Sequence, residues 1–463
     1  MSALEHVETA DAQATAALAR FAAGFELAAL PAQAQRRLAQ CLLDFIGVSA
    51  GARVHADSTP AFIKAVTAFG APDGPATVVG ERRRFAPRDA ALLNGTLAHS
   101  LDFDDTNLPS LVHAGAAVIP AALAVAERDG ADGAALLAAV AAGYEVACRI
   151  GLALGPGAYA RGFHPTAVAG LFGAVVAGAH LQGLGEDEVA SAFGLAGSMA
   201  AGSMQYLESG SWNKRFHPGL AAHNALLALE LARAGVVGAT HALEGRSGIL
   251  HSYSEAPRAE ALTDALGERW LLAETGIKPY PACRLAHGAI DAAFAARERL
   301  RGELPADAVL ALRVSPEAFA IVGGNGANKL APQNVVDAQF SVYFLTAIAL
   351  LDGAFSWASY ERIADPDVAA TIARLQVTAD DRVASAGAVL ALHSREVDLE
   401  QRVEQPRGEP DEALRWEDVE EKYRALAGAV FDEDRCVRIA AWVKRLPSAD
   451  PVSALTALLR TPA

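Results

Sequence analysis

The most apolar stretches of this chain read GAALLAAVAAGYEVACRIGLALG at residues 133–155 and TAVAGLFGAVVAGAHLQGL at residues 166–184. Glu145 and Arg149 interrupt the first stretch, and His180 interrupts the second. Neither stretch therefore offers the ~20 uninterrupted apolar residues that a membrane-spanning helix needs. Both predict long helices in the core of a protein that does not cross a membrane.

The composition of the whole chain also indicates helices. Its 463 residues are 52% hydrophobic and only 6% aromatic, and Ala and Leu, which lose little free energy on entering a helix, predominate. The length exceeds the ~250–300 residues over which one core usually grows, so we expect two domains. Residues 1–268 show helix after helix, separated by Gly and Pro and without a solenoid repeat. We predict a mainly α fold with a large all-helical domain over residues 1–268.

The pattern changes from residue 269 onward. The segments ALRVS at 311–315 and AVLALHSREVDL at 388–399 have the branched and alternating residues of strands. Residues 334–352 and 367–375 are typical of helices, and so is the C-terminal stretch from 416 to 459. We therefore predict a smaller α+β domain over residues 269–408 and a helical tail, residues 409–463, that returns to the first domain.

Charge and cysteine content exclude several functions. The net charge is −15, and no run of Lys or Arg forms a patch that would neutralise phosphates, so nucleic acid is not an expected partner. An anionic small molecule would need a few local cations to bind. The four scattered cysteines give neither a disulfide framework nor a zinc-site spacing, and the N-terminus MSALEHVETA has no signal-peptide pattern. We expect a cytoplasmic location.

Three carboxylates, Asp102, Asp104 and Asp105, lie in the segment HSLDFDDT, which is flanked by stretches without charge. Burying acids costs several kcal/mol unless they are paired, and perturbed acids gather at functional sites. If a helix continues through this segment, His99, Asp102 and Thr106 share one face, with Asp105 beside it. Asp104 then points away and serves as a cap or salt-bridge partner.

Two further histidines are candidates for chemistry. His113 lies in the loop LPSLVHAG before the next helix, where it is either an acid/base group or a structural histidine. His164 precedes Pro165 at the start of an apolar helix and either caps that helix or faces a cavity. His180 and His223 lie on apolar helical faces, and we expect them to be packed and hydrogen-bonded.

One cationic cluster lies in ESGSWNKRFHPGLAAHN, where Lys214 and Arg215 precede a helix expected to start near Pro218. Helix N-termini favour anions through their free N–H groups and the macrodipole. A surface lysine is the alternative, but the surrounding Ser, Gly and Trp residues indicate a shaped loop. This cluster therefore predicts a carboxylate-binding site.

A second cationic cluster lies in GIKPYPACRLAHGAI. Pro279 holds Lys278 in an extended conformation, and Arg284 lies on a helix expected to begin near Pro281. Together with Tyr280, these two cations are suited to clamping a polyanion, because Arg offers a planar fork and Lys a compact charge. The alternative is an ion pair at a domain junction.

Other classes of protein are weighed against these candidates. Asp102 to Asp105 also spell DxDD, an acid motif of helical terpene cyclases, but the low aromatic content argues against carbocation chemistry. A Mg²⁺ site is disfavoured because Asp102 and Asp104 would not share a helical face. A non-catalytic helical protein that binds a small molecule remains an alternative.

The motifs together resemble the 2-methylcitrate dehydratase (MmgE/PrpD) family over nearly the full length of the chain. The resemblance is carried by LNGTLAHSLDFDDT, GFHPTAVAG, GSWNKRFHPGLAAHNALLALELARAG and GIKPYPACRLAHGAIDA, in this order. It implies a large all-helical domain with an inserted α+β lid, a homodimer, and an active site between the domains without metal or cofactor. The substrates of the family are small polycarboxylates, which its members dehydrate, decarboxylate or epimerise.

The resemblance also implies roles for individual residues. By motif position, the functional acid and hydroxyl of the decarboxylase branch correspond to Asp102 and Thr106. The histidines of that branch correspond to His113 and His164, its lysines to Lys214 and Lys278, and its tyrosine to Tyr343 or Phe344.

These expectations combine into one mechanism. We expect a dehydratase-type lyase that acts on a hydroxylated polycarboxylate such as 2-methylcitrate, with an epimerase of iminodisuccinate-like dicarboxylates or a cis-aconitate-type decarboxylase as alternatives. All three reactions build negative charge next to a carboxylate. Lys214 and Lys278 are expected to stabilise this charge, His113 to move the proton, Asp102 to orient or charge an imidazole, and Thr106 to bind a carboxylate or hydroxyl of the substrate.

Overall fold

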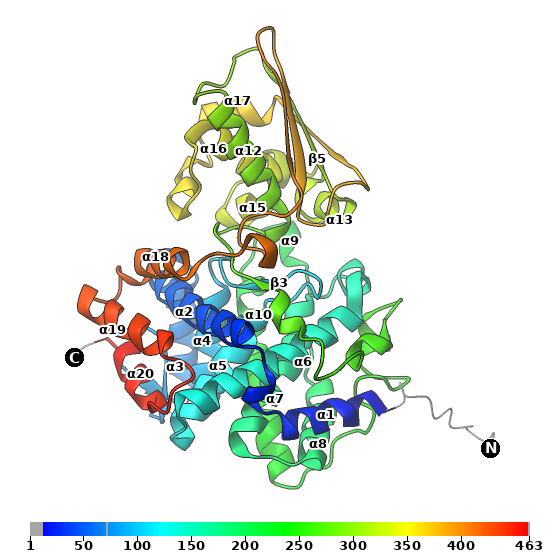
Figure 1. Cartoon of the computed structure of the whole chain (residues 1–463), viewed down its shortest axis with the longest axis vertical. Coiled ribbons are helices and arrows are strands. Elements are labelled where there is room, and N and C mark those ends of the chain that lie inside the picture. The colour runs from blue at the N-terminus through cyan, green and yellow to red at the C-terminus, as the bar shows by residue number, and fades with distance from the viewer. Residues whose placement is uncertain (1–12, 71–72, 462–463) are drawn as a thin grey trace, which may run out of the picture. The chain divides into compact units, whose positions relative to one another are not determined.

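The computed structural model describes residues 13–70 and 73–461, which divide into two compact units (Figure 1). Within the described residues, the first unit contains those up to Met204, Trp212–Ile277 and the C-terminal segment from Arg415. The second unit contains Gln205–Ser211 and Lys278–Leu414. The segment MSALEHVETA, on which the expectation about a signal peptide rests, lies outside the described residues.

The first unit consists of helices with two very short sheets, so the predicted mainly α fold is confirmed. Its longer helices are α1 (Ala14–Gly24), α2 (Ala32–His55), α3 (Thr59–Phe69), α4 (Pro87–His99), α5 (Ala114–Asp129), α6 (Gly133–Ala160), α7 (Pro165–Gln182), α8 (Glu186–Gly197), α10 (Asn213–Arg233), α18 (Trp416–Ala427), α19 (Glu433–Lys444) and α20 (Val452–Leu459). The short helix α11 (Ile249–Tyr253) completes the helices of this unit. The paired strands are β1 (Ala76–Thr77) with β2 (Arg84–Phe85), and β3 (Thr106–Asn107) with β4 (Thr275–Gly276).

The two apolar stretches form α6 and α7, which lie side by side in the core of the first unit. Both helices are apolar and long enough to cross a membrane, but 89% and 83% of their most apolar windows are buried inside the protein. A Cβ on Gly143 would lie 2.7 Å from the carbonyl oxygen of Gly173, and one on Gly173 would lie 2.5 Å from that of Gly143. Only glycine permits this approach, so the predicted core helices are confirmed.

A second close crossing, between α4 and α10, positions the functional residues. A Cβ on Gly95 would lie 2.7 Å from the Cα of Gly219, and one on Gly219 would lie 2.2 Å from the carbonyl oxygen of Leu92. His99 follows Gly95 by one turn of α4, and Lys214 lies in the first turn of α10. Because the two glycines at the crossing have no side chains, the end of α4 lies close to the start of α10.

The helix that we expected to run through HSLDFDDT ends earlier than predicted. Helix α4 ends at His99. Asp102 has φ 50°, a left-handed conformation that Asp tolerates better than most residues but that does not occur within a right-handed α-helix. The chain then enters β3, where Thr106 pairs with Gly276. The predicted helical face of His99, Asp102 and Thr106 is therefore wrong, and these side chains are placed by a turn.

The second unit combines short helices with a four-stranded sheet. The strands are β5 (Val309–Val314), β6 (Leu375–Ala379), β7 (Ala388–His393) and β8 (Asp398–Val403), in the order β6-β5-β7-β8. The helices are α9 (Tyr206–Ser209), α12 (His287–Arg299), α13 (Pro316–Ala318), α14 (Ala327–Leu330), α15 (Val335–Gln339), α16 (Val342–Asp352) and α17 (Pro366–Ile372). Strands β5 and β6 are parallel, and the other pairs are antiparallel.

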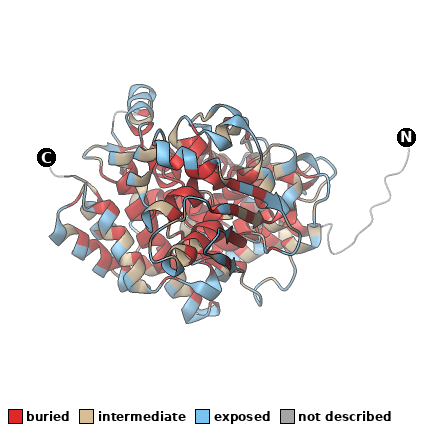
Figure 2. Ribbon diagram, turned by 90° about the horizontal axis from the view of Figure 1, so that it is seen from above, coloured by how far each residue is buried: buried red, intermediate tan, exposed pale blue. Residues whose placement is uncertain are grey.

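Burial follows the periodicity of these elements. In β7, five consecutive residues are buried, whereas β8 alternates between buried and more exposed positions as an edge strand does. Helix α12 packs against β7, β8 and α16. Figure 2 shows buried residues gathered in the interior of the ribbon, with exposed residues along its outer turns.

Several element boundaries differ from those expected. Residues 334–352 form two helices, because the side chain of Ser341 accepts from Phe344 N and starts α16 anew. Helix α12 begins at His287 rather than near Pro281, after a short 3₁₀ turn. Helix α10 begins at Asn213, so Pro218 lies within it.

Candidate active site

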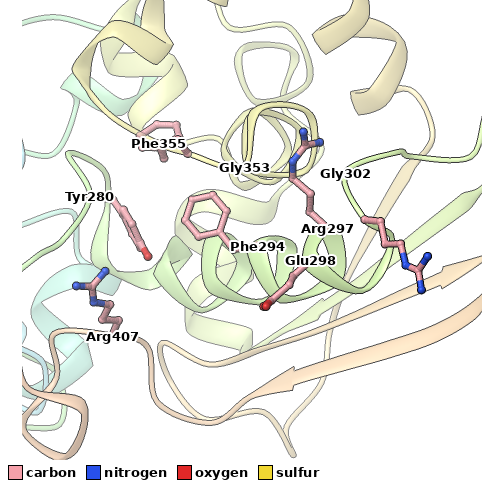
Figure 3. Close-up of a pocket in the computed structure, with 10 residues that line it drawn as sticks. Tyr280, Phe294, Arg297, Glu298, Gly302, Gly353, Phe355 and Arg407 are labelled. Carbon is pink, nitrogen blue, oxygen red and sulfur yellow. The ribbon is translucent and has the colours of Figure 1, made fainter.

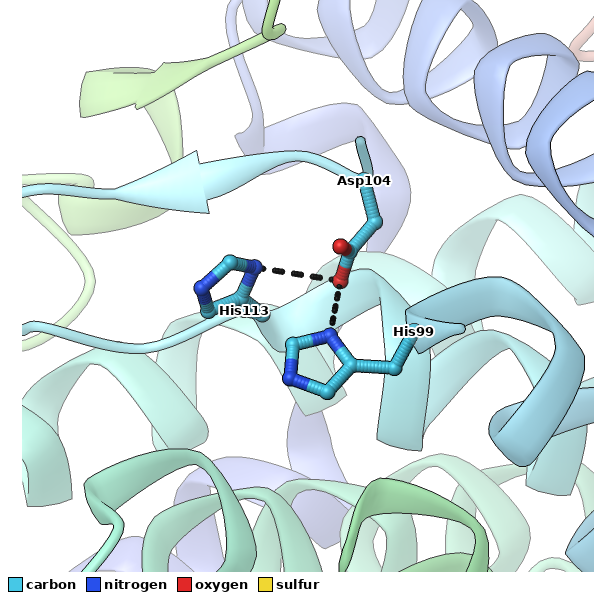
Figure 4. A group of neighbouring side chains, drawn as sticks. All are labelled: His99, Asp104 and His113. Carbon is cyan, nitrogen blue, oxygen red and sulfur yellow. Dashed lines mark hydrogen bonds and ion pairs between the residues drawn. The ribbon is translucent and has the colours of Figure 1, made fainter. Parts of the chain in front are cut away.

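Asp104 joins two histidines through one carboxylate oxygen (Figure 4). Its Oδ2 lies 2.7 Å from Nδ1 of His99 and 3.1 Å from Nδ1 of His113. His99 is the last residue of α4 and His113 is the N-cap residue of α5, so the segment between the two helices folds back to bring the rings together. The expectation that Asp104 points away from His99 is therefore wrong, because the helix ends before it.

The electrostatics of this group follow from its burial. Burial raises the pKa of Asp104, but the imidazoles of His99 and His113 outweigh it and hold that pKa well below its ordinary value. Burial also lowers the pKa of His99, and by more than the neighbouring Asp104 raises it. An ionised carboxylate thus accepts a hydrogen bond from a neutral His99 ring.

Two more histidines adjoin this group. His164, the N-cap residue of α7, has its Nδ1 3.2 Å from Nδ1 of His217 in α10, and its ring lies 5.6 Å from that of His99. Burial lowers the pKa of His164 well below its ordinary value, and neighbouring cations act in the same direction. Burial, His99 and Lys214 lower the pKa of His217 to about 4. The structure therefore gathers four imidazoles in the first unit.

Sequence reasoning did not identify His217 as a site residue. It lies three residues after Lys214, on the same face of α10, so helical spacing from that lysine was the signal that would have found it. The helix was expected to start near Pro218, which placed both residues in a loop. The two side chains are buried.

Lys214 is paired with Asp102. Its Nζ lies 2.7 Å from Oδ1 of Asp102, and both side chains are less than a tenth exposed. The left-handed conformation of Asp102 turns its carboxylate toward α10. Asp102 therefore holds a cation and acts on an imidazole through its charge, which raises the pKa of His99, whereas Asp104 holds the imidazoles by hydrogen bonds.

Asp105 belongs to a separate buried network. Its Oδ2 accepts from the hydroxyl of Tyr144 at 2.5 Å, and its Oδ1 accepts from Gly115 N at 3.1 Å. Burial raises the pKa of Asp105 to about 7, although the hydrogen bond from Tyr144 lowers it. This carboxyl therefore contacts the first turn of α5 through Gly115.

Three polar atoms of the cluster have no hydrogen-bond partner among the residues that the structure describes. They are Nε2 of His99, Oδ1 of Asp104 and Oγ1 of Thr106. Leaving a buried polar atom without a partner costs about 1–3 kcal/mol, so such atoms in a folded protein call for an explanation. Their presence beside a lysine and four imidazoles points to a place where a polar ligand binds.

The remaining predicted site residues lie in the second unit, and their part in the site stays a prediction. Lys278 is buried. Arg284 forms an ion pair with Glu409, and its Nη1 lies 3.0 Å from Nδ1 of His287. Both partners of this ion pair belong to the second unit, so it is not the domain-junction pair that was the alternative expectation.

The tyrosine position is also in the second unit. The hydroxyl of Tyr343 donates to Gly323 O at 3.1 Å and lies 2.9 Å from Oδ1 of Asn325. Phe344 is fully buried and stacks on Tyr360. Of the two candidates, only Tyr343 offers a hydroxyl, and its role stays a prediction.

A hollow of about 580 Å³ also opens in the second unit (Figure 3). Its lining includes Tyr280, Phe294, Phe355, Arg297 and Arg407. The guanidinium of Arg297 donates to Leu350 O at 2.7 Å, and the hydroxyl of Tyr280 donates to Asp291 at 2.6 Å. Because these polar groups are engaged within the unit, we assign the hollow no ligand.

His99, Asp104 and His113 also have the composition of a metal site. Their ligand atoms lie within 4.8 Å of one another, and two imidazoles with a carboxylate suit several divalent metals. The nearby ammonium of Lys214 contributes to the lowered pKa of His99, so the local field opposes a second cation. We therefore interpret the group as hydrogen-bonded, and a chelation experiment distinguishes the two interpretations.

Comparison with known proteins gives matches along most of the chain. The MmgE/PrpD N-terminal domain matches residues 16–262, and the MmgE/PrpD C-terminal domain matches residues 280–446. A cis-aconitate decarboxylase-like protein of Aspergillus oryzae, oryM, is 27% identical over 97% of this chain and 98% of its own. Cis-aconitate decarboxylases are 28% identical in Aspergillus terreus, over 94% of this chain and 93% of theirs, and in Homo sapiens, over 82% and 80%.

Proposed function

The chain belongs to the MmgE/PrpD family, and we propose that it is a lyase that acts on a small polycarboxylate by moving a proton at a carbon next to a carboxylate. The observation that carries this proposal is the buried pair of Lys214 and Asp102 in the same unit as the Asp104-linked histidines. A fixed cation and a held imidazole are the two groups that such a reaction needs.

The chemistry explains why both groups are required. Loss of water or CO₂ next to a carboxylate passes through an enolate-like anion, and an enzyme gains rate only by stabilising that anion more than the substrate. Lys214 supplies a positive charge in a buried setting, where electrostatic attraction is stronger than in water. His113 is placed to move the proton, and Thr106 offers a hydroxyl for a carboxylate or hydroxyl of the substrate.

Two outcomes of this chemistry are candidates. Dehydration of a hydroxylated polycarboxylate such as 2-methylcitrate is the outcome expected from the usual activity of the family. Decarboxylation of a cis-aconitate-like substrate is favoured by the relatives, because cis-aconitate decarboxylases align over 82–94% of this chain. Epimerisation uses the same proton transfer without a leaving group.

The second unit completes the proposal. We assign charge stabilisation to Lys278 as well as Lys214, and substrate binding to Arg284 and Tyr343. We regard the second unit as a lid inserted into the helical unit. A homodimer and a cytoplasmic location belong to the same proposal.

Proton NMR in D₂O tests the proposed function. The purified chain is incubated separately with 2-methylcitrate, cis-aconitate and iminodisuccinate. New alkene signals from 2-methylcitrate indicate dehydration, loss of CO₂ from cis-aconitate indicates decarboxylation, and deuterium at the α-carbon with inversion indicates epimerisation. We expect a lyase outcome, and epimerisation alone, or no reaction with any of the three, would contradict it.

A further inference from the structure

One carboxylate oxygen of Asp104 contacts two histidine rings, and in each ring the contacting atom is Nδ1. Oδ2 of Asp104 lies within hydrogen-bonding distance of Nδ1 of both His99 and His113. An ionised carboxylate only accepts hydrogen bonds, so each ring must present an N–H at Nδ1. A neutral imidazole carries one N–H, and Nε2 of each ring is then left with its lone pair.

The two rings differ in their exposure to solvent. The side chain of His99 is 0% exposed, whereas that of His113 is 10% exposed. The backbone N–H of His113 donates to Oγ1 of Thr166 at 3.0 Å, which fixes the start of α5 to α7. His113 is therefore the more accessible of the two rings, and it is anchored at both its backbone and its Nδ1.

We propose that Asp104 is a positioning residue that holds His113 as the Nδ1–H tautomer and so makes Nε2 the nitrogen that exchanges a proton with the substrate. His99 acts as the second donor, which keeps the carboxylate of Asp104 in place. This inference rests on the proposed function for its kinetic consequence, whereas the tautomer is a property of the protein alone.

The proton transfer balances without a change at Asp104. When Nε2 of His113 takes a proton from carbon, the electron pair of the C–H bond stays on the substrate as an enolate-like anion. The ring becomes an imidazolium, and the charge of Asp104 stabilises it. In dehydration, Nε2 then gives this proton to the departing hydroxyl as the C–O bond breaks, so water and the alkene leave and the ring is neutral again. In decarboxylation, the C–C bond to CO₂ breaks first, and protonated Nε2 gives its proton to the resulting carbanion. The lowered pKa of Asp104 keeps it ionised throughout.

Other titratable groups around the three linked side chains of His99, Asp104 and His113 stay in place when Asp104 is changed. These groups are Asp102 in the turn after α4, His164 at the N-cap of α7, and Lys214 and His217 in α10. Replacing Asp104 by Asn removes one negative charge and leaves these groups unaltered. The substitution therefore isolates the effect of one carboxylate on His113.

The tautomer is measured first, without substrate. The full chain is labelled with ¹⁵N at its 12 histidines, and long-range ¹H–¹⁵N correlations show which nitrogen of each ring carries hydrogen. His113→Gln identifies the signals of His113 by their disappearance. We expect hydrogen on Nδ1 and a bare Nε2 in the wild type, and a loss of this preference in Asp104→Asn.

The matched control is Asp105→Asn. Asp105 is the neighbouring buried carboxyl, but its partners are Tyr144 and Gly115 rather than a histidine. We expect this variant to leave the tautomer of His113 unchanged. If Asp105→Asn altered the tautomer as strongly as Asp104→Asn, a general loosening of the segment would replace positioning by Asp104.

Kinetics provide the second readout. Asp104→Asn should lower kcat by ~10²–10⁴, as expected when general acid–base catalysis is impaired. The limb of the pH–rate profile that reports His113 should also move to lower pH, because the charge that stabilised the imidazolium is gone. A uniform loss at every pH, with the tautomer unchanged, would indicate a merely structural role and overturn the inference.

The two proposals fail separately. A wild-type spectrum with hydrogen on Nε2 of His113 overturns positioning by Asp104, even if the chain is an active lyase. A wild-type spectrum with hydrogen on Nδ1 that Asp104→Asn abolishes supports positioning, even if no polycarboxylate is converted. Should Asp104→Asn fail to fold, the wild-type spectrum still decides which nitrogen is protonated.

Discussion

Asp102 and Asp104, two positions apart, hold different kinds of partner. The carboxylate of Asp102 pairs with the ammonium of Lys214, and that of Asp104 receives the rings of His99 and His113. Buried charges of this kind are costly unless paired, and here each is paired. One carboxylate of the segment therefore holds an ammonium, and the other holds two imidazoles.

The charge of Lys214 gives the first prediction. Lys214→Met would leave Asp102 buried without its cation, so the substitution is combined with Asp102→Asn to keep the site neutral. We expect the double variant to lower kcat/KM for the polycarboxylate by ~10²–10³, the usual effect of removing one group that stabilises an oxyanion. Steady-state kinetics measure the loss.

Lys64, which is exposed on α3, provides the control for this prediction. Lys64→Met removes a positive charge of the same kind from an exposed position. Wild-type kinetics in the double variant, or an equal loss in Lys64→Met, would show that the local ammonium does not stabilise the reaction.

Asp105 gives a prediction about pH. Its folded pKa of about 7 is raised from the ordinary value of 3.8, so between these two values the folded state holds a proton that the unfolded state releases. The stabilisation is complete below the unfolded pKa and is lost as the pH rises through about 7. The slope is at most ~1.4 kcal/mol per pH unit.

Asp105→Asn removes this titration, so thermal melts of both proteins from pH 5 to pH 8 measure it. We expect the melting temperature of the variant to increase relative to that of the wild type as the pH rises. The reason is that only the wild type loses the stability that comes from the protonated Asp105. A difference between the two proteins that stays constant with pH would mean that Asp105 is not protonated in the folded state.

Sequence reasoning pointed to the segment in which the acids and histidines meet, but it turned Asp104, which holds two of the rings, away from His99. Placing His99, Asp102 and Thr106 together required a helix, and helical spacing then turned Asp104 away. The positive φ of Asp102 ends that arrangement, and a left-handed aspartate is not visible in residue types alone. His217 was overlooked for a related reason, since it lies in the part of α10 that was expected to be a loop.

At the scale of elements, the C-terminal helix α18 supports the segment that carries the acids. Nζ of Lys422 lies 2.6 Å from Oδ1 of Asp44 in α2, donates to Phe103 O at 2.7 Å, and lies 3.7 Å from the centre of the Phe103 ring. Both charged side chains are buried. One lysine thus ties α2, α18 and the turn between Asp102 and Asp104 together.

Removing this lysine should destabilise the first unit. Lys422→Met would leave the charge of Asp44 buried without its cation, which typically costs about 3–5 kcal/mol. The double variant Asp44→Asn/Lys422→Met removes both charges, and we expect it to recover most of the loss. Urea unfolding measures the free energy of unfolding of both variants. A double variant that is no more stable than Lys422→Met would contradict a stabilising role for the ion pair between Lys422 and Asp44.

Some elements were predictable and others were not. The strands β5, β7 and β8 were found because branched and alternating residues mark them, and the helices α6 and α7 because they are apolar over their whole length. The starts of α10 and α12 were misplaced, since proline was taken as the first helical residue. Pro218 instead lies in the second turn of α10, beyond the first four N–H groups that a helix leaves unbonded, so it does not mark the start of this helix.

At the scale of the whole molecule, a net charge of −15 accompanies a site that we propose for an anionic substrate. The global field repels a polycarboxylate, so attraction must come from buried cations such as Lys214. The same cation opposes a metal ion at His99, Asp104 and His113. We expect dialysis against a chelator to leave kcat unchanged, and a loss of activity that added metal restores would favour the metal interpretation.

The central claim is that the buried centre of the first unit converts a polycarboxylate by moving a proton through His113. Proton NMR in D₂O, with 2-methylcitrate and cis-aconitate as substrates, compares the wild type with His113→Gln at equal enzyme concentration. We predict loss of water or CO₂ from one substrate with the wild type, at a rate ~10²–10⁴ higher than with the variant. Equal rates in the two proteins, or neither substrate converted by the wild type, would contradict the account.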